Sequence, residues 1–226
     1  RAVFTLIDGN GRETDFEACN VGFRKISIEN NVIKLNGKRV VFRGVNRHEH
    51  YWLTGRTVTK EHMTEEIKLM KKLNFNAVRT SHYPDDPVWY DLCDEYGLMV
   101  VCETNLETHG VAGNITNNPE WAEAMLERAR RMVLTHKNHP SIVSWSLGNE
   151  SGYGPGHAAM ANWIREYDNT RLVQYENNDP GPIASDIKCT MYPPMELLRY
   201  MIADNNDRRP IVLIEYAYQI TNSSGH

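Results

Sequence analysis

This sequence of 226 residues has few cysteines, no long apolar run and no excess of positive charge. Its 4 cysteines form no CxxC pair, which argues against a zinc cluster and against a disulfide scaffold. No apolar stretch approaches the roughly 20 residues that span a bilayer, so no membrane partner is expected. The net charge of −4 gives no reason to expect a nucleic-acid partner. Cysteines that read as buried free thiols favour a reducing compartment, and we predict a cytoplasmic protein.

What the sequence does contain is a change of pattern near residue 36. The first part reads as short strands joined by turn signals such as Asp8-Gly9-Asn10-Gly11. From Val40 onward, apolar strand patterns alternate with amphipathic helix patterns, which is typical of a parallel sheet with right-handed crossovers. The predicted strands are Val40–Phe42, Ala77–Val78, Leu98–Cys102, Ile142–Leu147, Leu172–Tyr175, Ile187–Cys189 and Ile211–Ile214. The predicted helices begin near Lys60, Pro87, Pro119, His157 and Pro194.

Seven such units predict an α/β fold, a (β/α)8 TIM barrel that lacks its last unit. A doubly wound open sheet is the alternative. That fold normally carries a Gly-rich phosphate turn after an early strand, and Arg43-Gly44-Val45-Asn46 does not match G-x-G-x-x-G. Because the chain opens inside a strand pattern and ends abruptly, we expect it to be a piece of a longer polypeptide.

Two predicted strands each end at a single glutamate, Glu150 and Glu215. A glutamate after a strand is usually just solvated. Parallel barrels, however, keep their chemistry at the carboxyl ends of their strands, and two carboxyl groups at one mouth can flank a glycosidic bond. Glu150 would be the protonated acid and Glu215 the ionised nucleophile. A retaining mechanism predicts that the two carboxyl groups lie about 5 Å apart.

A possible metal site follows the third predicted strand. Glu107 and His109 are two residues apart, so in extended chain both side chains point the same way. With a third carboxylate they could hold a divalent cation such as Mg²⁺, which prefers oxygen ligands. A capped loop with a hydrogen-bonded histidine is the alternative.

Further polar side chains follow other predicted strands. His48 and His82 come after the first and second strands, where they could meet sugar hydroxyls. They could equally be hydrogen-bonded histidines at the edge of the core. Tyr192 follows the sixth strand and could donate its phenol hydrogen to Glu215 or act as an acid.

Several whole phrases of the sequence can be read together. They are ACNVG at 18–22, RGVNRHEH at 43–50, RTSHYP at 79–84, ETHG at 107–110, WSLGNESG at 145–152 and EYA at 215–217. As a set they resemble the large β-galactosidases of glycoside hydrolase family 2. The resemblance extends from about residue 18 to residue 217, and GNES with EYA at strand ends is its most specific pair.

The resemblance implies an organisation and an activity. Residues 1–33 would be the end of an immunoglobulin-like β-sandwich domain, and residues 34–226 an incomplete TIM-barrel catalytic domain. The activity would be retaining hydrolysis of terminal non-reducing β-D-galactose residues in β-D-galactosides, by a parent protein that is a homo-oligomer. The implied roles are Glu150 as acid/base, Glu215 as nucleophile, Glu107, His109 and Glu150 as Mg²⁺ ligands, and His48, His82, Asn149 and Tyr192 as substrate-site residues, with Tyr192 bonded to the nucleophile.

One position departs from the family pattern. Tyr218 stands where the family usually has a histidine that contacts the galactosyl ring, so the preference for galactose stays open. A β-glucuronidase or β-mannosidase of the same family is the alternative enzyme, although Ser151 stands where glucuronidase-like relatives have proline after the acid. A non-catalytic carbohydrate-binding fragment is the alternative outside enzymes.

Overall fold

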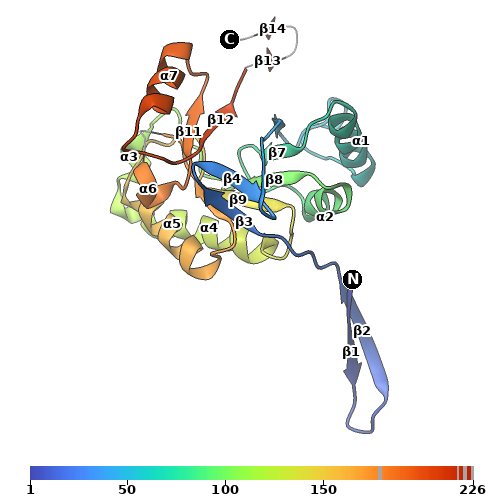
Figure 1. Ribbon diagram of the computed structural model, residues 1–226. Helices are drawn as coiled ribbons and strands as arrows, with labels where there is room; N and C mark the ends of the chain where they lie inside the picture. The colour runs from blue at the N-terminus through green and yellow to red at the C-terminus, as the bar shows by residue number, and fades with distance from the viewer. Residues whose placement is uncertain (178–179, 218, 221–222, 225–226) are drawn as a thin grey trace.

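The computed structural model describes all residues except 178–179, 218, 221–222 and 225–226 (Figure 1). Its helices are α1 (Lys60–Lys72), α2 (Pro87–Tyr96), α3 (Gly113–Thr116), the 3-10 turn η1 (Pro119–Trp121), α4 (Ala122–His136), α5 (Pro155–Tyr167), α6 (Gly181–Ala184) and α7 (Met195–Ala203). Its strands are β1 (Ala2–Ile7), β2 (Glu13–Cys19), β3 (Ile26–Glu29), β4 (Val32–Leu35), β5 (Lys38–Arg39), β6 (Gly44–Arg47), β7 (Ala77–Thr80), β8 (Met99–Glu103), β9 (Ile142–Ser146), β10 (Leu172–Gln174), β11 (Lys188–Met191), β12 (Ile211–Glu215), β13 (Gln219–Ile220) and β14 (Ser223–Ser224).

The main sheet is parallel and its strands are neighbours in chain order, β6-β7-β8-β9-β10. Strands β11 and β12 form a second parallel pair. The side-chain amide of Asn46 on β6 donates to the carbonyl of Ile214 on β12 at 3.1 Å, which joins the first barrel strand to the last described one. A doubly wound sheet reverses its strand order, whereas these described strands run on in one direction, so the predicted barrel architecture is confirmed.

The five predicted helices form close to where the sequence places them, for local reasons, whereas the short helices α3 and α6 were not predicted. The hydroxyl of Thr59 accepts from the backbone of His62 at the start of α1, and Asp86 with Pro87 opens α2. Helices α4 and α5 pack side by side against the sheet (Figure 1). Trp89 and Trp145 are completely buried, so both belong to the core.

The prediction of the first barrel strand is wrong. Residues 40–42 are not a strand, and Val41 is 53% exposed, whereas the strand is β6 at Gly44–Arg47. The side chain of Asn76 explains the shift, since it accepts from the amide of Arg43 at 2.8 Å and donates to the carbonyl of Val41 at 3.0 Å. These bonds occupy backbone groups that a strand ladder would use. The true strand was missed because Gly-Val-Asn-Arg is not an apolar run.

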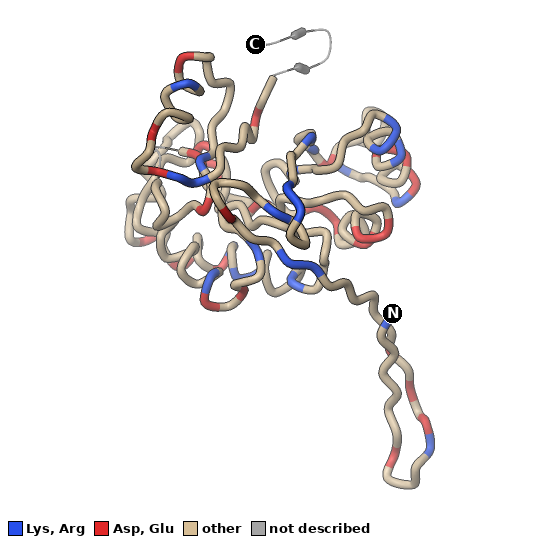
Figure 2. Tube along the Cα trace, viewed as in Figure 1, with Lys and Arg blue, Asp and Glu red and all other residues tan. Residues whose placement is uncertain are grey.

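The amino-terminal hairpin β1–β2 projects away from the barrel (Figure 1). Next along the chain, Arg24 donates to the carbonyls of Pro140 and Ile142, and β3, β4 and β5 form a small antiparallel sheet beside the barrel. Both signs of charge are interspersed over the outer helices (Figure 2). None of the helices in the described residues is long and apolar enough to cross a bilayer. The division into two domains at residue 33 stays a prediction.

Two buried histidines make the stability of the fold sensitive to acid. The ring of His136 lies 4.1 Å from that of Tyr90, and the ring of His157 lies 4.2 Å from that of Tyr175. Burial lowers the pKa of His136 and of His157 to about 4. The unfolded chain takes up these protons near pH 6.5, before the folded chain does, so the free energy of unfolding falls as the pH falls from about 6.5 to about 4.

We therefore expect His136→Phe to reduce the loss of stability on acidification. Between pH 7 and pH 5 the variant should lose about 2 kcal/mol less than the wild type, because phenylalanine has no proton to bind. Urea unfolding at the two pH values measures the difference. The exposed His50→Gln variant is the matched control and should behave like the wild type. An equal loss in His136→Phe and wild type would contradict the prediction.

Candidate active site

The loop after β9 carries Glu150 and depends on two glycines. Gly148 has φ +135°, and a Cβ there would lie 2.5 Å from the carbonyl oxygen of Leu106. Gly152 has φ +66°, and a Cβ there would lie 2.5 Å from the amide nitrogen of Gly113. Side chains cannot occupy either position without displacing backbone. The GNESG phrase therefore folds as a tight loop that places Asn149 and Glu150 at the mouth of the barrel.

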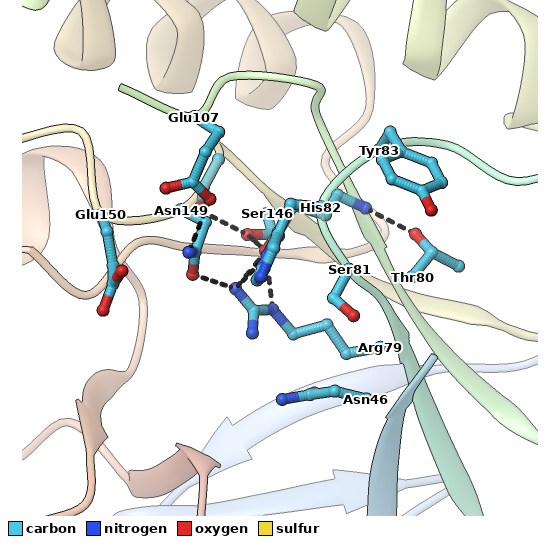
Figure 3. Close-up of polar contacts among 12 residues, drawn as sticks. Asn46, Arg79, Thr80, Ser81, His82, Tyr83, Glu107, Ser146, Asn149 and Glu150 are labelled. Carbon is cyan, nitrogen blue, oxygen red and sulfur yellow. Dashed lines mark hydrogen bonds and ion pairs between the residues drawn. The ribbon is translucent and has the colours of Figure 1, made fainter. Parts of the chain in front are cut away.

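Arg79, at the tip region of β7, is the central cation of this mouth (Figure 3). Its guanidinium donates to Glu103 at 2.6 and 3.0 Å and to the side-chain oxygen of Asn149 at 2.7 Å. It also donates to Glu215 at 3.1 Å. Burial by itself lowers the pKa of Arg79, but the carboxylates of Glu103, Glu176 and Glu215 outweigh burial and raise it above its usual value. Arg79 is therefore a permanent positive charge in the site.

Glu103, the last residue of β8, is completely buried beneath this mouth. It accepts from Arg79, lies 2.7 Å from Nδ1 of His82, and accepts from the hydroxyl of Ser146 at 2.6 Å. A buried carboxylate needs such partners, because an isolated one is strongly disfavoured. Glu103 therefore orients the side chains of Arg79 and His82, which face the mouth.

Glu215 ends β12, and its carboxylate is held from two sides. Arg79 donates to one oxygen, and the hydroxyl of Tyr192 donates a short hydrogen bond to the other. The Tyr192–Glu215 contact is the one that the resemblance implies. The side chain of Glu215 is 14% exposed, so it stays open to a ligand at the mouth. These two hydrogen bonds hold the Glu215 carboxylate in one orientation at the mouth.

Glu107, His109 and Glu150 come together on the same side of the mouth. Each offers a ligand atom, and these atoms all lie within 4.8 Å of one another. Nδ1 of His109 is 2.5 Å from Glu150. The amide of Asn149 donates to Glu107 at 2.7 Å (Figure 3). Two carboxylates and one imidazole suit a hard divalent cation that keeps some of its waters. This donor set fits the expected Mg²⁺.

The two histidines predicted to meet sugar also lie at this mouth. The rings of His48 and His82 are 5.4 Å apart, edge to face. The hydroxyl of Tyr83 lies 3.4 Å from Nδ1 of His48. Burial first, and then the neighbouring His82, lowers the pKa of His48, which favours a neutral ring able both to donate and to accept.

Residues 26–226 match the family model described as "Glycosyl hydrolases family 2, TIM barrel domain". The chain belongs to this family. It is 45% identical to a β-galactosidase of Photobacterium profundum and 46% identical to one of Alteromonas mediterranea, over 100% of this chain and 23% of each relative. The structure of a β-glucuronidase from Ruminococcus gnavus, solved with uronic deoxynojirimycin, superposes with a TM-score of 0.81. The match covers 95% of this chain and 42% of that one at 24% sequence identity, and it shows that the two share a fold.

All the residues predicted for the site in this family 2 barrel lie at one mouth. A continuous set of contacts runs from Glu215 through Arg79 and Asn149 to Glu107, which adjoins Glu150. Tyr218 lies outside the described residues.

Sequence reasoning missed Glu103 and Glu176, and it considered Arg79 only as a side chain that could meet sugar hydroxyls. Glu176 follows β10 and accepts from the backbone N–H of Glu150 at 2.8 Å. Burial, opposed by this hydrogen bond, raises the pKa of Glu176 to about 7. The signal was present, since Glu103 and Glu176 end apolar runs in the same way as Glu150 and Glu215.

Proposed function

We propose that the complete polypeptide is a retaining β-galactosidase that removes terminal non-reducing β-D-galactose from β-D-galactosides. The observation that carries the proposal is the single contact network that joins Glu215 to the surroundings of Glu150 at one barrel mouth. The names of the curated relatives supply the sugar. Because the chain spans 23% of those relatives, the activity belongs to a longer protein.

The chain's own residues account for a two-step reaction. Glu215, held in place by hydrogen bonds from Arg79 and Tyr192, attacks the anomeric carbon while Glu150 protonates the leaving oxygen. Glu150 then takes a proton from water while the water oxygen attacks the anomeric carbon. The bond from that carbon to Glu215 breaks, and the sugar leaves with retained configuration. A carboxyl separation of about 5 Å is the geometry that this route needs.

Magnesium is part of the proposal, and the donor set of Glu107, His109 and Glu150 supports it. When bound there, Mg²⁺ supplies positive charge beside the acid/base. Asn149, His48 and His82 would bind sugar hydroxyls, since each presents groups that donate or accept hydrogen bonds. The free, buried thiols of Cys93 and Cys102 support a reducing, cytoplasmic setting.

A panel of 4-nitrophenyl glycosides tests the choice of sugar. We expect kcat/KM of the complete polypeptide for the β-D-galactoside to exceed those for the β-D-glucuronide and the β-D-mannoside by at least about 100-fold, since a site built for one set of hydroxyls leaves groups unpaired with another. Release of nitrophenol measures each rate. Strong turnover of the glucuronide with none of the galactoside would overturn the proposal in favour of a β-glucuronidase.

A further inference from the structure

The backbone of Glu150 has an uncommon conformation. Its φ is +41°, in the left-handed region, although it is not glycine. Such a conformation is strained for a residue with a side chain, and it persists only where the surroundings enforce it. The direction of the Glu150 side chain therefore depends on whatever holds this peptide in place.

Two neighbouring residues that follow β10 hold it. The carboxylate of Glu176 accepts from the backbone N–H of Glu150 at 2.8 Å. The hydroxyl of Tyr175 accepts from the backbone N–H of Ser151 at 3.1 Å and donates to the carbonyl of Gly152 at 2.5 Å. We call Tyr175 and Glu176 together the β10 clamp. Its hydrogen bonds reach three successive residues, 150 to 152, of the loop that carries Glu150.

The placement of Glu176 is not explained by ordinary stability. Its second oxygen, Oε2, is buried and has no hydrogen-bond partner in the described part of the chain. Glu103, another buried carboxylate, lies close enough to disfavour its charge further. A half-satisfied buried carboxyl lowers stability, and an apolar residue there would remove that penalty. The bond to the N–H of Glu150 is the feature that such a replacement would lose.

We propose that Glu176 is a positioning residue, whose carboxyl oxygen holds the left-handed backbone of Glu150 so that the acid/base side chain faces the leaving oxygen. This inference rests on the proposed function, because it assigns Glu150 the proton transfer. A hydrogen bond from a backbone N–H to a carboxyl oxygen stabilises the conformation that makes it, so this bond offsets the strain at Glu150. Without it the loop can relax and turn the carboxyl away from the mouth.

The leaving group of the substrate provides the test in the complete polypeptide. A poor leaving group such as methanol needs a proton from Glu150, whereas 2,4-dinitrophenolate leaves without one. For Glu176→Ala we expect kcat/KM to fall about 10- to 100-fold for methyl β-D-galactoside and less than about 3-fold for the dinitrophenyl galactoside. The ratio of the two values does not depend on the folded fraction of the enzyme, so a general loss of stability does not mimic the result.

Matched variants separate positioning from charge and from folding. Glu176→Gln keeps an oxygen that accepts from the N–H of Glu150, so its ratio should stay within about 3-fold of the wild type. Glu166→Ala, on the exposed surface of α5, should leave both substrates unchanged. Where Glu176→Ala fails to fold, Tyr175→Phe loosens the same clamp and should lower the methyl galactoside rate selectively.

Three outcomes would overturn the positioning role. They are an equal fall for both substrates, no change for either, and a glutamine variant with the ratio of the alanine variant. Failure of the proposed function gives a different result, since the wild type itself would then not hydrolyse either galactoside.

Discussion

Glu215→Gln in the complete polypeptide should lower kcat for a β-galactoside by at least about 10³-fold. The amide cannot form the glycosyl-enzyme bond, so the covalent route is lost. The structure strengthens this expectation, because Arg79 and Tyr192 both donate hydrogen bonds to the Glu215 carboxylate and hold it at the mouth. Steady-state release of nitrophenol, extended to long incubations, measures the residual rate.

A surface glutamate supplies the control for this substitution. Glu196 lies in the first turn of α7 and is exposed, so Glu196→Gln should keep wild-type turnover. Near-normal activity of Glu215→Gln, with the control also active, would refute the nucleophile assignment. Recovery of activity in Glu215→Ala by added azide would support it, because alanine leaves room for a small anion in place of the missing carboxylate.

Arg79→Met should have the largest effect on stability. Removing the guanidinium leaves Glu103 completely buried without its cation, and breaking such a buried pair costs about 3–5 kcal/mol. It also removes a donor from Glu215, so kcat should fall by at least about 100-fold in the fraction that folds. Denaturant unfolding of the chain and turnover by the complete polypeptide measure the two effects.

A double variant separates the two roles of Arg79. Arg79→Met combined with Glu103→Met removes both buried charges, so it should regain part of the lost stability while activity stays low. Arg131→Met is the matched control, because Arg131 is 78% exposed in its pair with Glu127 and should contribute less than about 0.5 kcal/mol. An Arg79→Met variant whose free energy of unfolding equals that of the wild type would contradict this prediction.

Much of the barrel could be predicted because its strands and helices have strong local signals. Thr59, Asp86 and Gly97 mark helix ends through backbone hydrogen bonds and dihedral angles that are set locally. Local signals did not predict the first barrel strand, because β6 is polar and its position depends on the side chain of Asn76. Asn76 lies 33 residues beyond Arg43, so no local pattern could reveal that contact.

The candidate site also has a part that the sequence predicts and a part that it does not. The rule that chemistry gathers where parallel strands end selects Glu150 and Glu215, and applied to every strand it also selects Glu103 and Glu176. The rule cannot say which carboxylate meets a cation and which meets a backbone N–H. Those partners come from other strands, and their distances depend on the closure of the sheet.

By itself the sequence determined the alternation of strands and helices, the barrel, the family and the acidic residues at the strand ends, because each rests on local spacing or on contiguous phrases. Only the tertiary structure decided that Arg79 joins Glu103, Asn149 and Glu215, and that Glu176 holds the backbone of Glu150. Both arrangements bring together side chains from different strands, and the burial that gives these charges their strength exists only after the barrel has formed.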